Sequence, residues 1–354
     1  MKRRGSLDVL KIFATVFIIF HHYQQVLEVY YPTGVNFFSG SFPWKHMVEL
    51  FFMISGFVML PWCRRITGNV TGSDFKSFIL HRYRRFIPML AVTAVCYELM
   101  SAVIIRFLPA LTDEFIRLSV WGTVCNILCI QSGWCVRNVM INNPTWYICV
   151  LMLCYIVFWI ITDLCRRKNR SPVYAYLFMI MLGFSVRMTG MNIPFLNEYT
   201  ARGFISFFLG ILLAAADDRY ELHGAFRTVF YVLFALLILF TPDIEKDYSI
   251  CYLFLPLIIL IFTSERVEKL FTARFWTTLG AIQFHAYLWH LIVIECMRVI
   301  ILLTDAAVEK RVYMFITLIA AELVGTLSYF LLDINADRLF IAILPKRKAN
   351  AQKA

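Results

Sequence analysis

The stretch of sequence that decides the fold runs from residue 7 to residue 27 and reads LDVLKIFATVFIIFHHYQQVL. Its apolar part, 9–27, matches the length of about 20 residues that a helix needs to cross a bilayer. The stretch has no small-residue cleavage site and carries His21 and His22 late in the apolar run. We therefore expect a permanent first membrane span and not a cleaved signal peptide.

The composition extends this interpretation to the whole chain. Of the 354 residues, 60% are hydrophobic and 16% are charged, whereas soluble domains are about 45–50% apolar and about 25% charged. An ordinary soluble domain and a disordered chain are both excluded. The formal net charge of +11 is better explained by sorting of basic residues across a membrane than by nucleic-acid binding, so no nucleic-acid partner is expected.

Apolar segments predict an all-α polytopic membrane protein with about ten transmembrane helices. The two segments at 225–242 and 248–263 are short, and a hairpin that does not fully span would leave eight spans with the same sidedness. We expect one integral membrane domain at 1–340, followed by a basic tail at 341–354. The ten expected spans are 9–27, 46–62, 86–108, 146–165, 173–190, 201–216, 225–242, 248–263, 277–303 and 312–333.

The basic residues predict the orientation of these spans. With the N-terminus inside, 24 of the 34 Lys and Arg residues fall in segments on the inner side. Because cytoplasmic loops carry an excess of Lys and Arg, both termini are expected in the cytoplasm.

The longest expected outer segment is 109–145. Its short apolar stretch, Val120 to Ile130, is too short to span and predicts a re-entrant or interfacial element. This segment contains three cysteines, Cys125, Cys129 and Cys135. A disulfide between two of them is one alternative, although packing as free thiols is favoured. No Cys-x-x-Cys or other metal-ligand spacing is present in the sequence, so no metal is expected.

Polar residues within the first span share one helical face. Lys11 and His22 are 11 residues apart, nearly three full turns, which separates them by roughly 16 Å along the axis. Asp8 lies one turn before Lys11 on nearly the same stripe. This stripe suits a ligand held by its anionic end at the cytoplasmic surface with its reactive end deep in the membrane. A snorkelling lysine and a structural histidine explain the pattern equally well.

The two adjacent histidines cannot face the same way, since neighbouring helical residues diverge by about 100°. We assign the general-base role to His22, which shares the face of Lys11, because an imidazole exchanges protons near neutral pH. His290 lies deep in the ninth expected span, and His285 is expected to face elsewhere. Glu49, near the outer end of the second span, is expected to orient a histidine or a substrate hydroxyl, whereas Ser55-Gly56 is expected to serve packing.

Arg82 and Arg85 precede the third expected span. They are three residues apart, hence neighbours on one face, and two guanidiniums form a suitable clamp for phosphate. Ordinary anchoring at the cytoplasmic surface explains them as well. Pro88 is expected to disturb the helix at the membrane entrance.

Six elements, in this order, resemble the acyltransferase type 3 family of integral membrane O-acyltransferases. The resemblance covers about residues 7–333, nearly the whole chain. The elements are a basic residue followed after ten others by histidine (Lys11, His22), an acidic residue before Phe-Phe and Ser-Gly-Phe (Glu49 to Phe57), an arginine pair before proline (Arg82, Arg85, Pro88), a fourth-span aromatic pair (Trp146, Tyr155), a Phe-Phe-x-Gly helix (Arg202 to Gly210) and a late Tyr-Leu-x-His element (Tyr287 to His290).

The resemblance implies transfer of an acyl group, usually acetyl, from cytoplasmic acyl-CoA to a hydroxyl, often of a sugar or envelope glycan at the outer face. The expected partners are acyl-CoA, a glycan or lipid-linked sugar, and the lipids of the plasma membrane, and homo-oligomerisation is left open. The residues implied are His22 as general base with Glu49 and His290 in the reaction chamber, Lys11, Arg82 and Arg85 for the CoA phosphates or pantetheine entrance, and Trp146 and Tyr155 on the acceptor side.

The sequence departs from the family pattern at three positions. Lys11 replaces the commoner arginine, which keeps the charge and loses bidentate geometry. Leu151 stands where many members carry glutamate, and Gln283 replaces a frequent serine. The esterase-like domain of some members is not expected here, so a separate partner completing the transfer stays open.

Two other functions stay open at this point. Glu98 and Glu322 lie near mid-span without an evident partner, which is compatible with a transporter or exporter of a glycan or small molecule. A structural membrane protein without chemistry is the third alternative.

Overall fold

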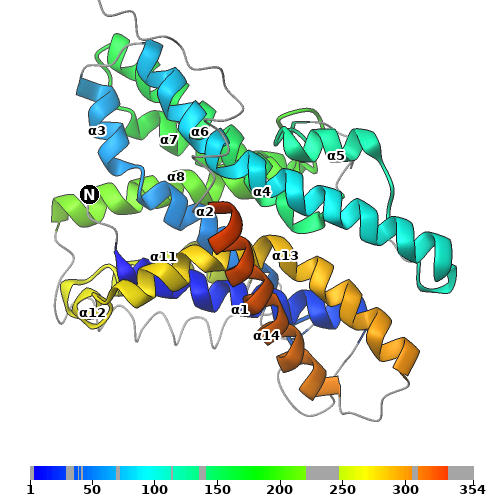
Figure 1. The fold of residues 1–354 in the computed structure, drawn as a ribbon. Coiled ribbons are helices and arrows are strands. Elements are labelled where there is room, and N and C mark those ends of the chain that lie inside the picture. Colours follow the sequence, from blue (N-terminus) through cyan, green and yellow to red (C-terminus); the bar gives the residue numbers. More distant parts are fainter. Residues whose placement is uncertain are drawn as a thin grey trace, which may run out of the picture.

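The computed structural model describes residues 4–28, 36–38, 40, 43–68, 72–112, 115–134, 141–220, 247–304 and 310–333. Within these ranges the chain is built of helices and contains no β-strand (Figure 1). The longer helices are α1 (Gly5–Leu27), α2 (Met47–Phe57), α3 (Leu60–Gly68), α4 (Gly72–Phe107), α6 (Trp146–Arg167), α7 (Val173–Thr189), α8 (Glu198–Tyr220), α13 (Arg274–Thr304) and α14 (Lys310–Ser328). Shorter ones are α5 (Val120–Ile127), α11 (Leu255–Phe262) and α12 (Glu265–Leu270).

Seven helical segments of the described chain are long and apolar enough to cross a membrane, which makes the chain a multi-pass membrane protein. They match seven of the ten expected spans, and the segment at 46–62 is divided into α2 and α3. The expected spans at 173–190 and 248–263 correspond to shorter apolar helices, Val173–Thr189 and Asp247–Phe262. The expected span at 225–242 and the tail at 341–354 lie outside the described residues, so the count of ten stays a prediction.

Two local expectations can be compared directly with the helices. Pro88 does not end α4, which continues through it for 36 residues in total. The stretch from Val120 forms the short helix α5, whose first turn is capped by the Ser119 hydroxyl accepting from the Gly122 backbone N–H at 3.0 Å. Cys125 and Cys129 are both buried, and Cys135 lies outside the described residues, so a disulfide in this segment stays a prediction.

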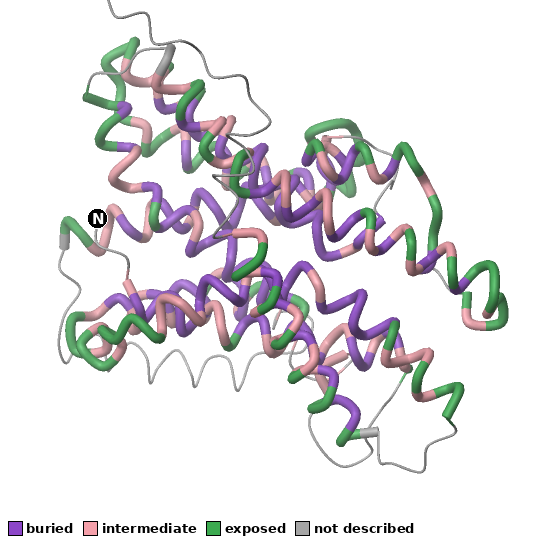
Figure 2. Tube along the Cα trace, viewed as in Figure 1, coloured by how far each residue is buried: buried purple, intermediate pink, exposed green. Residues whose placement is uncertain are grey.

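The helices form two groups with the core between them. Helices α1, α13 and α14 pack together, and α2, α7 and α8 pack together. Figure 1 shows α1, α11, α13 and α14 in the lower part of the view and α3, α6, α7 and α8 in the upper part. Buried residues concentrate where the two groups meet (Figure 2). This interface holds the candidate site.

Helices α1 and α13 run in the same direction. Gly280 of α13 lies directly against Asp8 near the start of α1, and the ring of His290 lies beside that of His22 further along, with ring centroids 5.2 Å apart. Two helices that cross a membrane in the same direction are an even number of membrane crossings apart along the chain, as the first and ninth spans are in the predicted topology. Which end faces the cytoplasm stays a prediction.

The start of α1 is held by a residue from a distant part of the sequence. Arg4, at the N-cap position, makes no side-chain cap. Instead, the Glu268 carboxylate of α12 accepts from the Gly5 backbone N–H at 3.1 Å and from the Ser6 backbone N–H at 3.3 Å. These are the donors that a helix N-terminus leaves unsatisfied.

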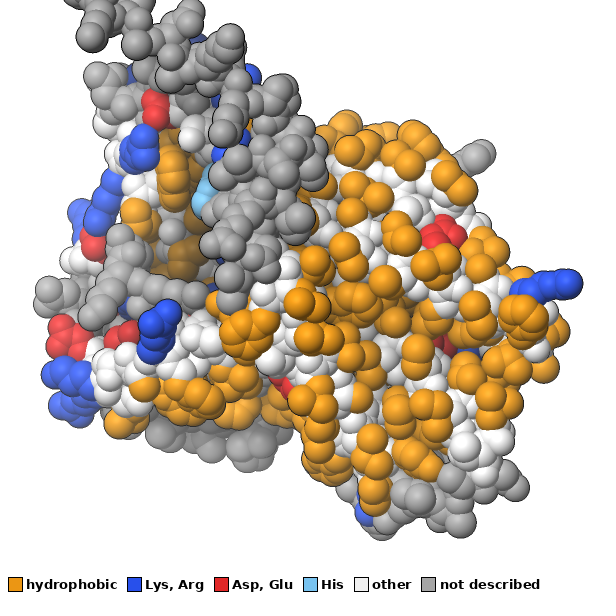
Figure 3. Space-filling view, in the orientation of Figure 1, with side chains coloured by type: hydrophobic (Ala, Val, Ile, Leu, Met, Phe, Trp, Pro, Cys, Tyr) orange, Lys and Arg blue, Asp and Glu red, His pale blue; other side chains and the backbone are white. Residues whose placement is uncertain are grey.

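Charged and apolar surfaces are separated along the molecule. Figure 3 shows Lys and Arg side chains gathered along the left edge of the view, near α3 and α12, while apolar side chains cover the right side. The Arg64–Asp218 ion pair joins α3 to the end of α8 at this same charged end. The charged end thus brings together several basic clusters that were expected on one side of the membrane.

Two glycines allow α2 and α8 to pack backbone against backbone. A Cβ at Gly56 would lie 1.9 Å from the Phe207 carbonyl oxygen, and a Cβ at Gly210 would lie 2.1 Å from the Met53 carbonyl oxygen. The expectation that Ser55-Gly56 serves packing is therefore confirmed for Gly56.

Replacing Gly56 by alanine is expected to lower the unfolding temperature of the protein in detergent. The added methyl must push α8 away, and overpacking of a tight core costs about 1–3 kcal/mol. Gly68→Ala is the matched control, since its Cβ would meet no atom within 4 Å. Equal unfolding temperatures for the two variants would contradict close packing of α2 on α8.

Candidate active site

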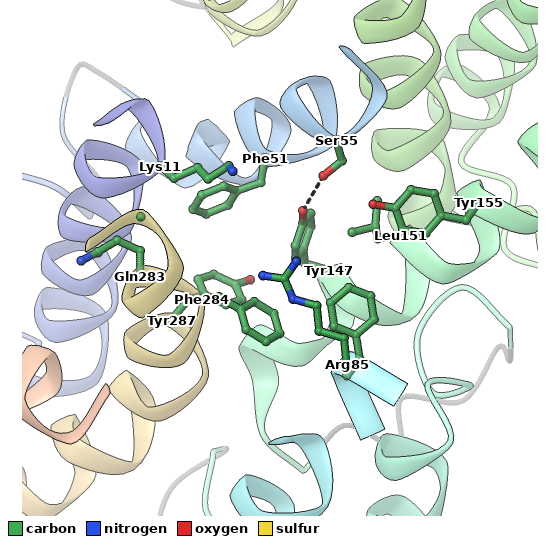
Figure 4. Close-up of a pocket in the computed structure, with 12 residues that line it drawn as sticks. Lys11, Phe51, Ser55, Arg85, Tyr147, Leu151, Tyr155, Gln283, Phe284 and Tyr287 are labelled. Atoms are coloured by element: carbon green, nitrogen blue, oxygen red, sulfur yellow. Dashed lines mark hydrogen bonds between the residues drawn. The ribbon is translucent and has the colours of Figure 1, made fainter. Parts of the chain in front are cut away.

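A cavity of about 270 Å³ opens between the two helix groups. Five helices line it: α1, α2, α4, α6 and α13 (Figure 4). The lining residues are Lys11, Phe51, Ser55, Arg85, Phe86, Tyr147, Leu151, Tyr155, Gly280, Gln283, Phe284 and Tyr287. The sequence thus contributes two cations, three tyrosines and an apolar wall from segments that are up to 276 positions apart.

The cations of the cavity come from different helices. Lys11 donates to Asp8 at 2.9 Å, and Figure 4 shows the Arg85 guanidinium directed into the cavity. The Arg82 guanidinium lies 4.3 Å from the centre of the Tyr155 ring, so it stands directly behind a lining residue. The structure therefore gathers the three predicted donor-binding cations around one cavity.

Three aromatic rings that line the cavity lie against one another. Tyr287 lies 5.6 Å from Phe51 and 5.9 Å from Tyr147 between ring centroids. The Tyr147 hydroxyl is 3.1 Å from the Ser55 hydroxyl, and the Tyr287 hydroxyl donates to the Pro144 carbonyl at 2.7 Å. We call Phe51, Tyr147 and Tyr287 the aromatic floor.

A pair of histidines lies beyond the aromatic floor. Tyr287 is 5.6 Å from His290, and His290 is 5.2 Å from His22, each between ring centroids. His290 is fully buried, whereas His22 is half-buried. His285 faces elsewhere, with its Nδ1 atom 3.1 Å from the Ser328 hydroxyl of α14.

The hydrogen bonds of the two histidines leave one nitrogen of each for chemistry. The His290 Nδ1 atom is 2.6 Å from the Tyr287 carbonyl, which can only accept, so Nδ1 carries the proton and Nε2 carries the lone pair. The His22 Nδ1 atom is 3.0 Å from the Gln25 side-chain oxygen, so this ring also keeps Nε2 for accepting a proton.

Glu49 lies in a separate cluster of charges. Its carboxylate accepts from Arg202 Nε at 2.7 Å and from Arg202 Nη2 at 3.0 Å, a bidentate pair. The His46 Nδ1 atom lies 3.1 Å from the same carboxylate, and its Nε2 atom lies 3.1 Å from Asp247. Trp146 belongs to this cluster, with the Arg202 guanidinium 4.6 Å from its ring centre.

This cluster also contains the only grouping of potential metal ligands that the described residues offer. Atoms of His46, Glu49 and Cys251 lie within 4.8 Å of one another. Because both Glu49 oxygens already accept from Arg202 and one of them is also contacted by His46, ion pairs explain this grouping.

The structure separates two residues that were predicted together on the acceptor side. Trp146 lies with Arg202 and Glu49, whereas Tyr155 lines the cavity beside Arg82. Leu151 also lines the cavity and makes its wall apolar at that point.

Glu98 and Glu322, the two glutamates compatible with a transporter, both accept hydrogen bonds. Glu98 accepts from the Ser119 backbone N–H and the Thr123 hydroxyl, both at 2.8 Å, which fastens α5 to α4. Glu322 accepts from the Gln283 amide at 2.9 Å. Gln283 thus joins the cavity wall to α14.

This arrangement, a cationic cavity and a histidine pair divided by an aromatic floor, can be compared with known families. Residues 4–330 match the model of the acyltransferase 3 family, described as an acyltransferase domain. The chain belongs to the acyltransferase 3 family. The comparisons match no curated protein and no solved structure.

Membership of the acyltransferase 3 family supports a membrane acyltransferase as the general activity. The family match covers every helix that lines the cavity and both histidines of the pair. Sequence reasoning did not predict the role of Arg202 or His46. A carboxylate buried as deeply as Glu49 needs a cation, so a basic partner could have been predicted. Nothing in the sequence, however, identifies Arg202 as that partner.

Proposed function

We propose that this acyltransferase-family protein transfers an acyl group, expected to be acetyl, from acyl-CoA to a hydroxyl of a sugar or envelope glycan. The donor would enter from the cytoplasmic side of the plasma membrane, and the acceptor would approach from the opposite side. The observation that carries the proposal is the order of features: cationic cavity, aromatic floor, histidine pair.

The cavity suits an acyl-CoA. Phosphates pair well with Lys and Arg, and Arg85 and Arg82 make no ion pair with a carboxylate among the described residues. Beside these cations the cavity has an aromatic and apolar lining, which suits an acyl-thioester arm. We assign Tyr155 to this donor cavity and not to the acceptor side, because it lies against Arg82.

The half-buried His22 suits the role of general base. Its Nε2 atom would take the proton of the acceptor hydroxyl as the oxygen attacks the thioester carbonyl. The carbon–sulfur bond then breaks, and the same proton passes to the leaving sulfur, which gives an ester and free CoA. His290 lies beside His22, with their rings tilted by 32°, and would hold it in place. Glu49 acts at a distance, by fixing Arg202 and His46.

Replacing Arg85 or Lys11 by alanine is expected to weaken acetyl-CoA binding by roughly 10- to 100-fold, because a hydrogen bond to a charged group contributes about 1.5–3 kcal/mol. Calorimetric titration of the purified protein with acetyl-CoA measures this change.

Arg84→Ala is the matched control for that experiment, since Arg84 is exposed on the same helix and does not line the cavity. Equal losses for Arg84→Ala and Arg85→Ala would mean that general surface charge and not the cavity attracts the donor.

A further inference from the structure

Three neighbouring histidines each direct their Nδ1 atom at an oxygen. The rings of His21 and His290 both lie 5.2 Å from the ring of His22, between centroids. The His21 Nδ1 atom is 2.8 Å from the Phe37 carbonyl, and the His290 Nδ1 atom is 2.6 Å from the Tyr287 carbonyl. Both of these partners are backbone atoms, so the main chain orients these two rings.

His22 differs from its neighbours because its partner is a side chain. The His22 Nδ1 atom is 3.0 Å from the Oε1 atom of Gln25. The two residues are three positions apart on α1, so the helix itself places their side chains on one face. An amide oxygen can only accept a hydrogen bond, so in the neutral ring Nδ1 carries the proton and Nε2 keeps the lone pair. One replaceable side chain therefore selects the tautomer that can accept a proton at Nε2.

The surroundings of His22 are without negative charge in the described part of the chain. The ionisable side chains that face it there are His21 of α1 and His290 of α13. Gln25 is itself uncharged, so it orients the ring without drawing a further proton onto it. A carboxylate at the same place would stabilise the protonated ring, because an opposite charge nearby favours the charged form.

The adjacent Gln24 has a different role. Its side chain is fully buried, and its Oε1 atom accepts from the backbone N–H groups of Phe37 at 2.5 Å and of Phe38 at 3.0 Å. Gln24 thus fastens a distant segment to α1, whereas Gln25 contacts the histidine. Two consecutive residues of the same type therefore separate a structural amide from one that orients a histidine.

We propose that Gln25 is the positioning residue of the base, and that its uncharged amide fixes the tautomer of His22 while leaving the ring unprotonated at neutral pH. The inference rests on the proposed function, in which His22 Nε2 takes the proton of the acceptor hydroxyl. In Ser-His-Asp enzymes a carboxylate orients the histidine and stabilises its protonated form. An amide at this position gives a weaker base that is ready to accept a proton at a lower pH.

The pH dependence of transfer tests this role. The purified full chain is given radiolabelled acetyl-CoA and envelope carbohydrate between about pH 6 and about pH 9. Gln25→Glu is expected to move the acid limb of the profile upward by about 1–3 pH units, so the variant is slower than wild type at about pH 6 and reaches its rate at about pH 9. Gln25→Leu is expected to lower the rate about tenfold, the effect of roughly one hydrogen bond, without moving the acid limb upward.

A second readout does not depend on transfer. Nitrogen NMR of protein labelled with ¹⁵N-histidine reports the tautomer of His22 and the pH at which its ring takes up a proton, and His22→Ala identifies its signals. Wild type is expected to carry its proton on Nδ1 in the neutral ring. Gln25→Leu is expected to mix the two tautomers, and Gln25→Glu to raise the titration midpoint.

Gln24→Leu is the matched control, expected to lower the unfolding temperature while the tautomer and the titration midpoint of His22 stay those of the wild type. An unchanged tautomer in Gln25→Leu, or an unchanged midpoint in Gln25→Glu, would overturn the inference. If the midpoint seen by NMR moved in Gln25→Glu while the pH profile of transfer did not, the contact of Gln25 with His22 would stand and the assignment of His22 as base would fail. Wild-type protein that transfers no acetyl group would overturn the proposed function.

Discussion

Replacing His22 by alanine is expected to lower the rate of acyl transfer by about 100-fold or more, the usual contribution of a general base, while acetyl-CoA still binds. His22 is separated from the donor cavity by Tyr287 and His290, so its removal leaves the cationic residues intact. The measurement is transfer of radiolabelled acetyl groups to envelope carbohydrate, with donor binding followed by calorimetry on the same preparation.

The adjacent His21 provides a matched control. Its Nδ1 atom lies 2.8 Å from the Phe37 carbonyl, and it does not stack on His290. His21→Ala is expected to retain most of the transfer rate. Equal rates for His22→Ala and wild type would rule out His22 as the base, and a loss confined to His21→Ala would move the role to the other histidine.

Replacing Glu49 by alanine is expected to destabilise the protein by about 3–5 kcal/mol, because it leaves a guanidinium without its counter-charge in a poorly solvated place. The Glu49 side chain is fully buried and that of Arg202 is 16% exposed. The free energy of unfolding in mixed micelles measures the loss.

The double variant Glu49→Leu with Arg202→Leu separates structure from chemistry. Removal of both charges is expected to restore much of the stability that either single change removes, since replacement of a buried pair by apolar residues is often nearly neutral. If Glu49→Ala kept its stability and lost only transfer, Glu49 would instead act directly on the reactants.

Much of the fold follows from the sequence because apolar length is a local property. Seven of the ten expected spans are present as long helices, and those at 173–190 and 248–263 are present as shorter apolar helices with nearly the expected bounds, Val173–Thr189 and Asp247–Phe262. The division of the span at 46–62 was not expected. The helix is interrupted by a turn at Val58 and Met59, and the hydropathy of the segment does not reveal such a break.

The site could be predicted only in part. Helical periodicity put Lys11 and His22 on one face, and both lie toward α13: Lys11 lines the cavity together with Gln283, and His22 lies beside His290. Periodicity cannot say that the aromatic floor divides them. The pairing of Glu49 with Arg202 was also hidden, because 153 positions separate them and only the packing of α2 on α8 joins them.

The central claim is that acyl transfer from the cationic cavity to a hydroxyl beyond the aromatic floor is what this membrane protein does. Purified wild-type protein in sealed proteoliposomes, given radiolabelled acetyl-CoA and envelope carbohydrate, tests it most directly. We predict that label enters the carbohydrate as an ester, from which mild alkali releases acetate. The claim would be contradicted if no label entered the carbohydrate in the presence of acetyl-CoA. Carbohydrate that crossed the vesicle membrane in the absence of acetyl-CoA would then favour a transporter.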